Sequence, residues 1–101
     1  MTPLVEKALK AITKGADLSS GLSYSSDMNR AKEMFLRLHK AGETLSGKEI
    51  TEWAVSNGWK ARDADVLGTL GEDIAKGKKV FVSDGPWWNE NVLELLVQQS
   101  F

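Results

Sequence analysis

The sequence predicts an all-α fold, a compact bundle of four or five short helices with a helix-turn-helix-like corner and little or no β structure. Apolar residues recur at helical spacing through most of the chain, and capping residues flank these segments. Only one short run, residues 78–82, resembles a strand, and a lone strand has no pairing partner. With 101 residues and two prolines, we expect one helical domain that spans residues 1–101.

The first helix is expected to begin with Thr2 as its N-cap and Pro3 in the first helical position, where a missing N–H costs no hydrogen bond. Gly15 is expected to end this helix as a left-handed C-cap. The Ser-rich residues that follow predict a loop. The apolar stripe of the helix is formed by Leu4, Val5, Ala8, Leu9 and Ile12.

A second helix is predicted from Ser25 or Ser26 to Ala41, with Gly42 directly behind it. Its spacing places five apolar side chains on one face, which we expect to be buried. These residues are Met28, Ala31, Met34, Phe35 and Leu38.

Residues 46–76 have the pattern of two helices joined by a tight turn. Ser46 and Glu49 can form a capping box, in which each side chain accepts the other residue's backbone N–H. The third helix should bury Ile50, Trp53 and Ala54 and end at Asn57-Gly58. The fourth, from about Ala61 to Lys76, should bury Ala64, Leu67, Leu70 and Ile74.

Two glycines, Gly68 and Gly71, lie inside the fourth predicted helix. Each costs about 1 kcal/mol relative to alanine in a helix interior. The pair therefore predicts either a neighbour that approaches closely or a break in this helix.

The C-terminal segment is predicted to form a last helix that begins at Pro86 or Asn89. This helix is apolar on nearly all sides, which is typical of a buried or docked helix. Among the four tryptophans we expect Trp53 and Trp59 in the core, with the firmer expectation for Trp53. The adjacent Trp87 and Trp88 are either core residues or part of a contact surface. In the second case the candidate partner contacts are Trp87, Trp88, Leu93 and Val97.

Charge is distributed unevenly along the chain. Residues 1–40 contain seven Lys/Arg and four Asp/Glu, a net charge of +3, whereas residues 41–101 contain six and ten, a net charge of −4. The helix-turn-helix-like pattern thus lies in the acidic part, which disfavours nucleic acid because phosphate contacts need a basic excess. If nucleic acid is bound, the candidate contacts are Lys60, Arg62, Lys76, Lys78 and Lys79.

The sequence contains no catalytic or cofactor motif, so we predict a protein that is not an enzyme and has no cofactor. His39 is the only histidine and cysteine is absent, so no metal site is expected. The N-terminus lacks the apolar core of a signal peptide, and no segment has the ~18 apolar residues of a membrane span. We therefore expect a cytoplasmic protein. Because no catalytic motif is present and the C-terminal segment is strongly apolar, we expect it to bind another protein or a second copy of itself.

The run "ITEWAVSNGWKARDADVLGTLGEDIAKGKKVFVSDGPWW", residues 50–88, resembles the YoaC-like family of small bacterial proteins, and the similarity extends over nearly the full chain. The resemblance implies a small all-helical domain in the bacterial cytoplasm. It implies no activity, cofactor or binding residue.

Overall fold

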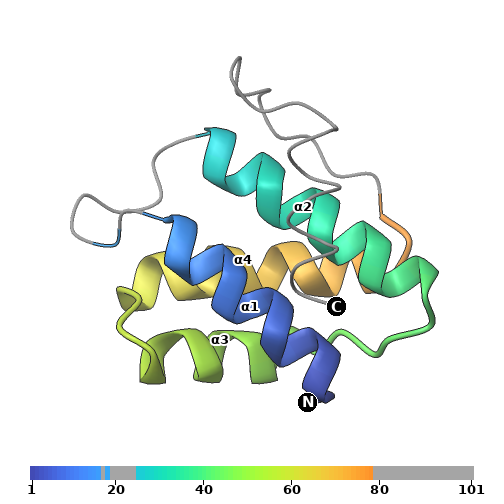
Figure 1. Cartoon of the computed structure of the whole chain (residues 1–101), viewed down its shortest axis with the longest axis horizontal. Helices are drawn as coiled ribbons and strands as arrows, with labels where there is room; N and C mark the ends of the chain where they lie inside the picture. The colour runs from blue at the N-terminus through green and yellow to red at the C-terminus, as the bar shows by residue number, and fades with distance from the viewer. Residues whose placement is uncertain (17, 19–24, 79–101) are drawn as a thin grey trace.

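The computed structural model describes residues 1–16, 18 and 25–78, except for the side chains of residues 25–27. This part of the chain contains four α-helices and no strand, which confirms the predicted all-α class. The helices are α1 (Pro3–Gly15), α2 (Ser25–Lys40), α3 (Gly47–Ser56) and α4 (Ala61–Ala75). Figure 1 shows α1 crossing in front of α4, with α3 and α4 running in opposite directions.

Helix α1 begins as the sequence predicts. Thr2 is the N-cap, and its hydroxyl oxygen accepts a hydrogen bond from the backbone N–H of Val5 at 3.3 Å. Pro3 opens the helix, where its ring already has a helical φ angle. The side chains that turn inward are Val5, Ala8, Leu9 and Ile12.

The prediction that Gly15 is a left-handed C-cap is wrong. Gly15 is the last residue of α1, and the helix ends at an extended Ala16 whose N–H donates to the Thr13 carbonyl at 3.2 Å. A Cβ at Gly15 would collide with the guanidinium of Arg30 from α2. That guanidinium is buried, and its Nη2 donates to the Ile12 carbonyl at 2.8 Å. Glycine is therefore needed here for space and not for its conformational freedom.

Helices α2 and α3 also agree closely with their predicted limits. After α2, Gly42 has a φ of +87°, the left-handed conformation that glycine adopts without strain. The Ser46 hydroxyl caps α3 by accepting from the Glu49 N–H at 3.4 Å. The Glu49 carboxylate forms an ion pair with the amino group of Met1 at 2.9 Å. Gly58, with a φ of +95°, follows the predicted end of α3.

Helix α4 is continuous from Ala61 to Ala75, so the glycines within it do not break it. Its N-cap, Lys60, makes no side-chain capping hydrogen bond. Gly77, with a φ of +74°, follows the helix. The strand-like run predicted at residues 78–82 lies outside the described residues except for Lys78.

The core is formed by the apolar faces of all four helices. Trp59, in the turn between α3 and α4, is only 3% exposed, and its indole N–H donates to the Thr13 hydroxyl at 2.8 Å. Trp53 is only partly buried and packs at the edge of this core. The expectation that favoured Trp53 over Trp59 is therefore reversed. The fully buried large side chains are Val5, Leu9, Ile12, Met34, Phe35, Leu38, Ile50 and Leu67.

Candidate interaction surface on α3 and α4

Helices α3 and α4 touch through their backbones at two glycines. A Cβ at Gly47 would lie 2.8 Å from the Gly68 carbonyl oxygen, and a Cβ at Gly68 would lie 2.5 Å from the Gly47 carbonyl oxygen. The Thr51 side chain occupies the remaining space over Gly68, and its hydroxyl donates to the Ala64 carbonyl at 3.3 Å. Gly68 and Gly71 predict a neighbour that approaches α4 closely, and this neighbour is α3.

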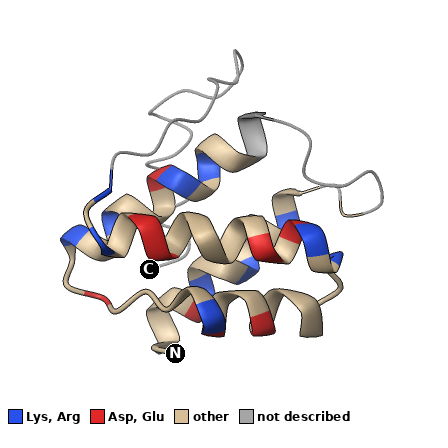
Figure 2. Cartoon of the chain, turned by 180° about the vertical axis from the view of Figure 1, so that it is seen from behind, with Lys and Arg blue, Asp and Glu red and all other residues tan. Residues whose placement is uncertain are grey.

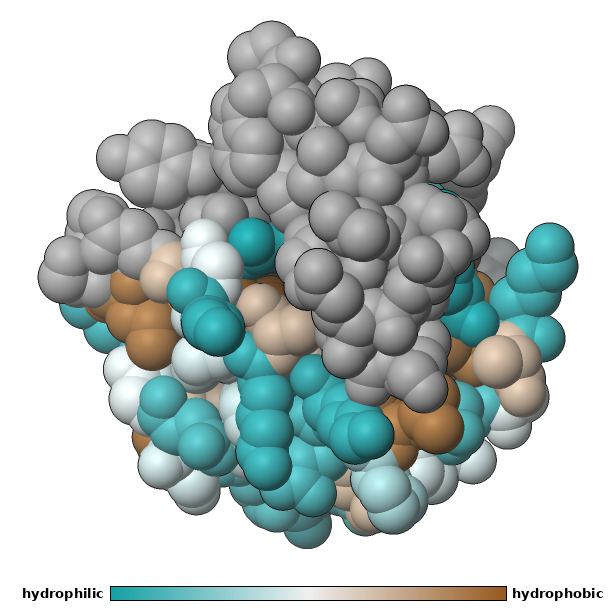
Figure 3. All heavy atoms as spheres, in the orientation of Figure 1, coloured by the Kyte–Doolittle hydropathy of each residue, from teal (hydrophilic) through white to brown (hydrophobic). Residues whose placement is uncertain are grey.

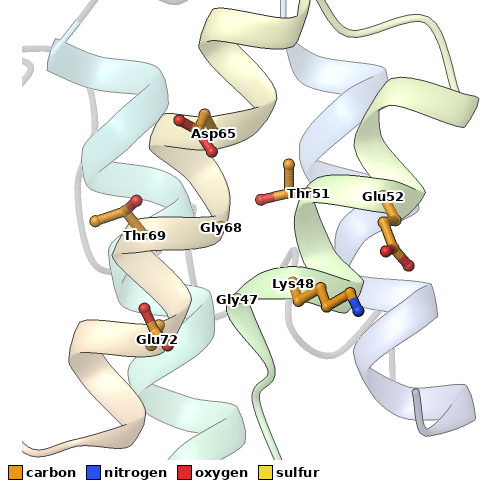
Figure 4. Close-up of a pocket in the computed structure, with 8 residues that line it drawn as sticks. All are labelled: Gly47, Lys48, Thr51, Glu52, Asp65, Gly68, Thr69 and Glu72. Carbon is orange, nitrogen blue, oxygen red and sulfur yellow. The ribbon is translucent and has the colours of Figure 1, made fainter.

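A shallow groove of about 420 Å³ lies along this contact. Figure 4 shows Asp65, Thr69 and Glu72 projecting from α4, with Lys48 and Glu52 projecting from α3. All five of these side chains are exposed, so the groove is open to solvent. Its full lining is Gly47, Lys48, Thr51, Glu52, Asp65, Gly68, Thr69 and Glu72.

The groove is acidic overall. Lys48 is its only cationic side chain, and Glu52, Asp65 and Glu72 contribute three carboxylates, a formal net charge of 1 − 3 = −2. Figure 2 shows this side of the molecule, with acidic residues on both halves of α4. A negative surface of this kind attracts a cationic partner and repels phosphate.

The predicted nucleic-acid contacts do not form one patch. Lys60 and Arg62 are exposed at the start of α4, whereas Lys76 lies beyond its other end, about 24 Å away at the helical rise per residue. Lys76 forms an ion pair with Glu72 at 3.5 Å. Lys78 pairs with Asp73 at 3.7 Å. Lys79 lies outside the described residues.

The candidate partner contacts in the C-terminal segment, Trp87, Trp88, Leu93 and Val97, also lie outside the described residues. His39 is exposed on the last turn of α2. Within residues 1–16, 18 and 25–78, no three His, Cys, Asp or Glu side chains are grouped to hold a metal ion. In the same residues, no helix is long and apolar enough to span a bilayer.

In a comparison with protein families, residues 1–96 match the family described as a domain of unknown function (DUF1889). The chain belongs to the DUF1889 family. Searches of curated proteins and of solved structures found no match. The DUF1889 match assigns no activity to any residue, so the surface on α3 and α4 is identified as a candidate site from its geometry alone.

In this DUF1889 protein the sequence pointed to part of the groove and missed the rest. Gly68 predicts a close neighbour, and the negative net charge of residues 41–101 agrees with the acidity of the groove. Thr51 and Thr69 gave no signal, because a threonine on a helix becomes a groove residue only when a second helix lies beside it. Gly47 follows the predicted cap Ser46, and nothing in its local sequence predicts a contact with α4.

Proposed function

We propose that this DUF1889 protein is a non-enzymatic protein-interaction module whose binding surface is the outer face of α3 and α4. The observation that carries the proposal is the open acidic groove along the contact at Gly47 and Gly68. Because the two backbones touch there, the walls of the groove hold a fixed spacing before any partner arrives. Preorganisation of this kind lowers the entropy that binding costs.

Two exposed apolar side chains on α3 and α4 also suit a protein partner. Val55, on the last turns of α3, is 49% exposed, and Val66 on α4 is 44% exposed. Neither valine lines the groove, but both offer apolar contacts on the same two helices, and protein interfaces combine apolar and polar contacts.

Site-directed photo-crosslinking in cells tests this proposal. A photoreactive amino acid at Thr69, in the groove, is expected to give a discrete adduct, and the same residue at the exposed Lys40 of α2 serves as the matched control. The substitution Asp65→Lys should abolish the adduct at position 69, and mass spectrometry of that adduct identifies the partner. Equal labelling from both positions, or an adduct that survives Asp65→Lys, would contradict the proposal.

The second candidate is a nucleic-acid-binding regulator that uses residues 46–76 as a helix-turn-helix-like unit. The exposed Lys60 and Arg62 at the start of α4 favour it, since recognition helices contact DNA through their first turns. Asp63 and Asp65 in the same part of α4 oppose it, because each carboxylate would repel phosphate.

Fluorescence anisotropy with labelled duplex DNA separates the two candidates. The nucleic-acid candidate requires binding at low salt whose log affinity falls linearly with log salt concentration. It also requires Arg62→Glu to abolish that binding. We expect no binding even at low salt.

Three further expectations belong to this proposal. Self-association through Trp88 and Leu93 remains a prediction, tested by Trp88→Ala and Leu93→Glu in light scattering. The resemblance to the YoaC-like family and the cytoplasmic location remain predictions in the same sense.

A further inference from the structure

Helix α1 presents a basic face to solvent. Lys7, Lys10 and Lys14 are all exposed and are separated by three and four residues, the spacing that aligns side chains along one face of a helix. Lys10 forms an ion pair with Glu6 at 3.6 Å. These are the charged side chains of α1, so the helix has a formal net charge of 3 − 1 = +2, equal and opposite to the −2 of the groove.

The charges on the two surfaces also have the same spacing. Lys7 and Lys14 are seven residues apart on α1, and Asp65 and Glu72 are seven residues apart on α4. At the helical rise per residue, each pair spans about 10.5 Å. When α1 lies along the groove in the direction opposite to α4, Lys14 can meet Asp65 and Lys7 can meet Glu72, which then exchanges its intrahelical partner Lys76 for Lys7. In this arrangement Lys10 lies beside Thr69.

The two surfaces of one chain cannot meet each other. Helix α1 buries Val5 and Leu9 in the core and helix α4 buries Leu67 in the same core, so both turn their charged faces away from it. Helix α1 is nearest the viewer in Figure 1, whereas α4 comes forward when the molecule is turned around in Figure 2. Figure 3 shows the side of the molecule on which α1 lies, where hydrophilic side chains cover the lower centre of the described part and hydrophobic patches lie to either side.

We propose that the groove on α3 and α4 binds the lysine face of α1 from a second copy of this chain. This inference rests on the proposed function and names its partner. The occupant follows from charge complementarity, because α1 matches the groove in net charge and in the spacing of its charges.

Such a contact joins two different surfaces, so it is head-to-tail. Each added copy leaves one α1 face and one groove unused, and assembly continues into a ring or an open chain. It is also weak and sensitive to salt, because exposed ion pairs contribute little individually and are screened. This behaviour differs from a two-fold dimer formed through the C-terminal segment, which stops at two copies.

Sedimentation equilibrium of the full chain tests the inference with two charge-reversed variants. One carries Lys7→Glu and Lys14→Glu, and the other carries Asp65→Lys and Glu72→Lys. A third variant, Lys32→Glu with Lys40→Glu on α2, has the same change in net charge as the first and serves as its control. Circular dichroism checks that each variant keeps its helices.

At about 0.01 M salt, where the Debye length is about 30 Å, the average mass of the unaltered chain should rise past that of a dimer with concentration. At about 1 M salt, where this length is about 3 Å, the rise should disappear. Each variant reversed in α1 or in the groove should remain monomeric when alone, and an equimolar mixture of the two should associate again. The α2 control should associate like the unaltered chain.

A chain that stays monomeric at low salt would overturn the inference, as would association that both reversed variants retain. A mixture that fails to associate would overturn it too. These outcomes leave the proposed function standing if the crosslink at Thr69 joins a different protein. If the photo-crosslinking experiment gives no adduct specific to the groove, the proposed function itself is wrong.

Discussion

At the scale of single residues, two buried polar contacts fix the end of α1 to the rest of the molecule. Arg30 donates to the Ile12 carbonyl, and Trp59 donates to the Thr13 hydroxyl, which in turn donates to the Leu9 carbonyl at 2.8 Å. Buried donors cost free energy when they lack a partner, so these contacts select one position for α1.

The hydrogen bond between Trp59 and Thr13 gives a prediction at this scale. Thr13→Val keeps the shape of the side chain but removes the acceptor for the buried indole N–H, and should lower the free energy of unfolding by about 1–2 kcal/mol. Trp59→Phe should also destabilise the fold. In urea unfolding, the double variant should lose less than the sum of the two single variants, by about 1 kcal/mol. Strict additivity would show that the hydrogen bond does not contribute to stability.

At the scale of helices, the contact between α3 and α4 depends on glycines, because they have no side chain to hold the two helices apart. Gly68 allows the Thr51 side chain and the Gly47 carbonyl to approach α4, and Gly71 makes room for Ile50 in the same way. The loss of helix propensity at these glycines is offset by the close packing that they permit.

Gly68→Ala is therefore expected to destabilise the protein although alanine favours helices. The new methyl group would collide with Thr51 and crowd the backbone of Gly47, and overpacking of this kind costs about 1–3 kcal/mol. Thr69→Ala, at the exposed neighbouring position, is the control and should change stability little. Thermal unfolding of both variants measures the difference. A Gly68→Ala protein more stable than the unaltered chain would contradict the close contact.

A substitution at the start of α4 is expected to stabilise the protein, in contrast to Gly68→Ala. Lys60 is the N-cap but its side chain makes no capping hydrogen bond, and its positive charge lies at the positive end of the helix dipole. Lys60→Asp should stabilise the protein by about 1 kcal/mol, because the carboxylate can accept from the free N–H groups of the first turn. Lys60→Ala, which has no acceptor, should gain less in chemical denaturation. Equal gains would mean that capping is not the cause.

At the scale of the whole molecule, the four helices share one core, and polar contacts connect distant segments. Met1 pairs with Glu49 on α3, and Arg30 on α2 bonds to the end of α1. With connections at both ends of α1, we expect the helices to unfold together and not one by one.

Cooperative unfolding can be measured in a full-length variant that carries both Trp87→Phe and Trp88→Phe. Its tryptophan fluorescence then comes only from Trp53 and Trp59. The urea transitions followed by fluorescence and by circular dichroism at 222 nm should coincide, as two-state unfolding requires. A helical signal that persists after the fluorescence change would show that α1 or α2 unfolds separately.

The sequence by itself determined the four helices of the described residues and most of the side chains that they bury. Caps such as Thr2 and Ser46, and stripes such as Ala64 to Ile74, act within a few residues of chain, so local spacing is enough to identify them. Only the tertiary structure decided why Gly15 is glycine, and that Trp59 lies deeper than Trp53.

The candidate interaction surface was likewise decided by the tertiary structure. Lys76 pairs with Glu72 within one helical turn, which the spacing alone permits but does not require. The groove itself exists because Gly47 on α3 meets Gly68 on α4, twenty-one positions along the chain. Contacts between residues so far apart depend on how whole helices pack, and that depends on the shape of the entire core.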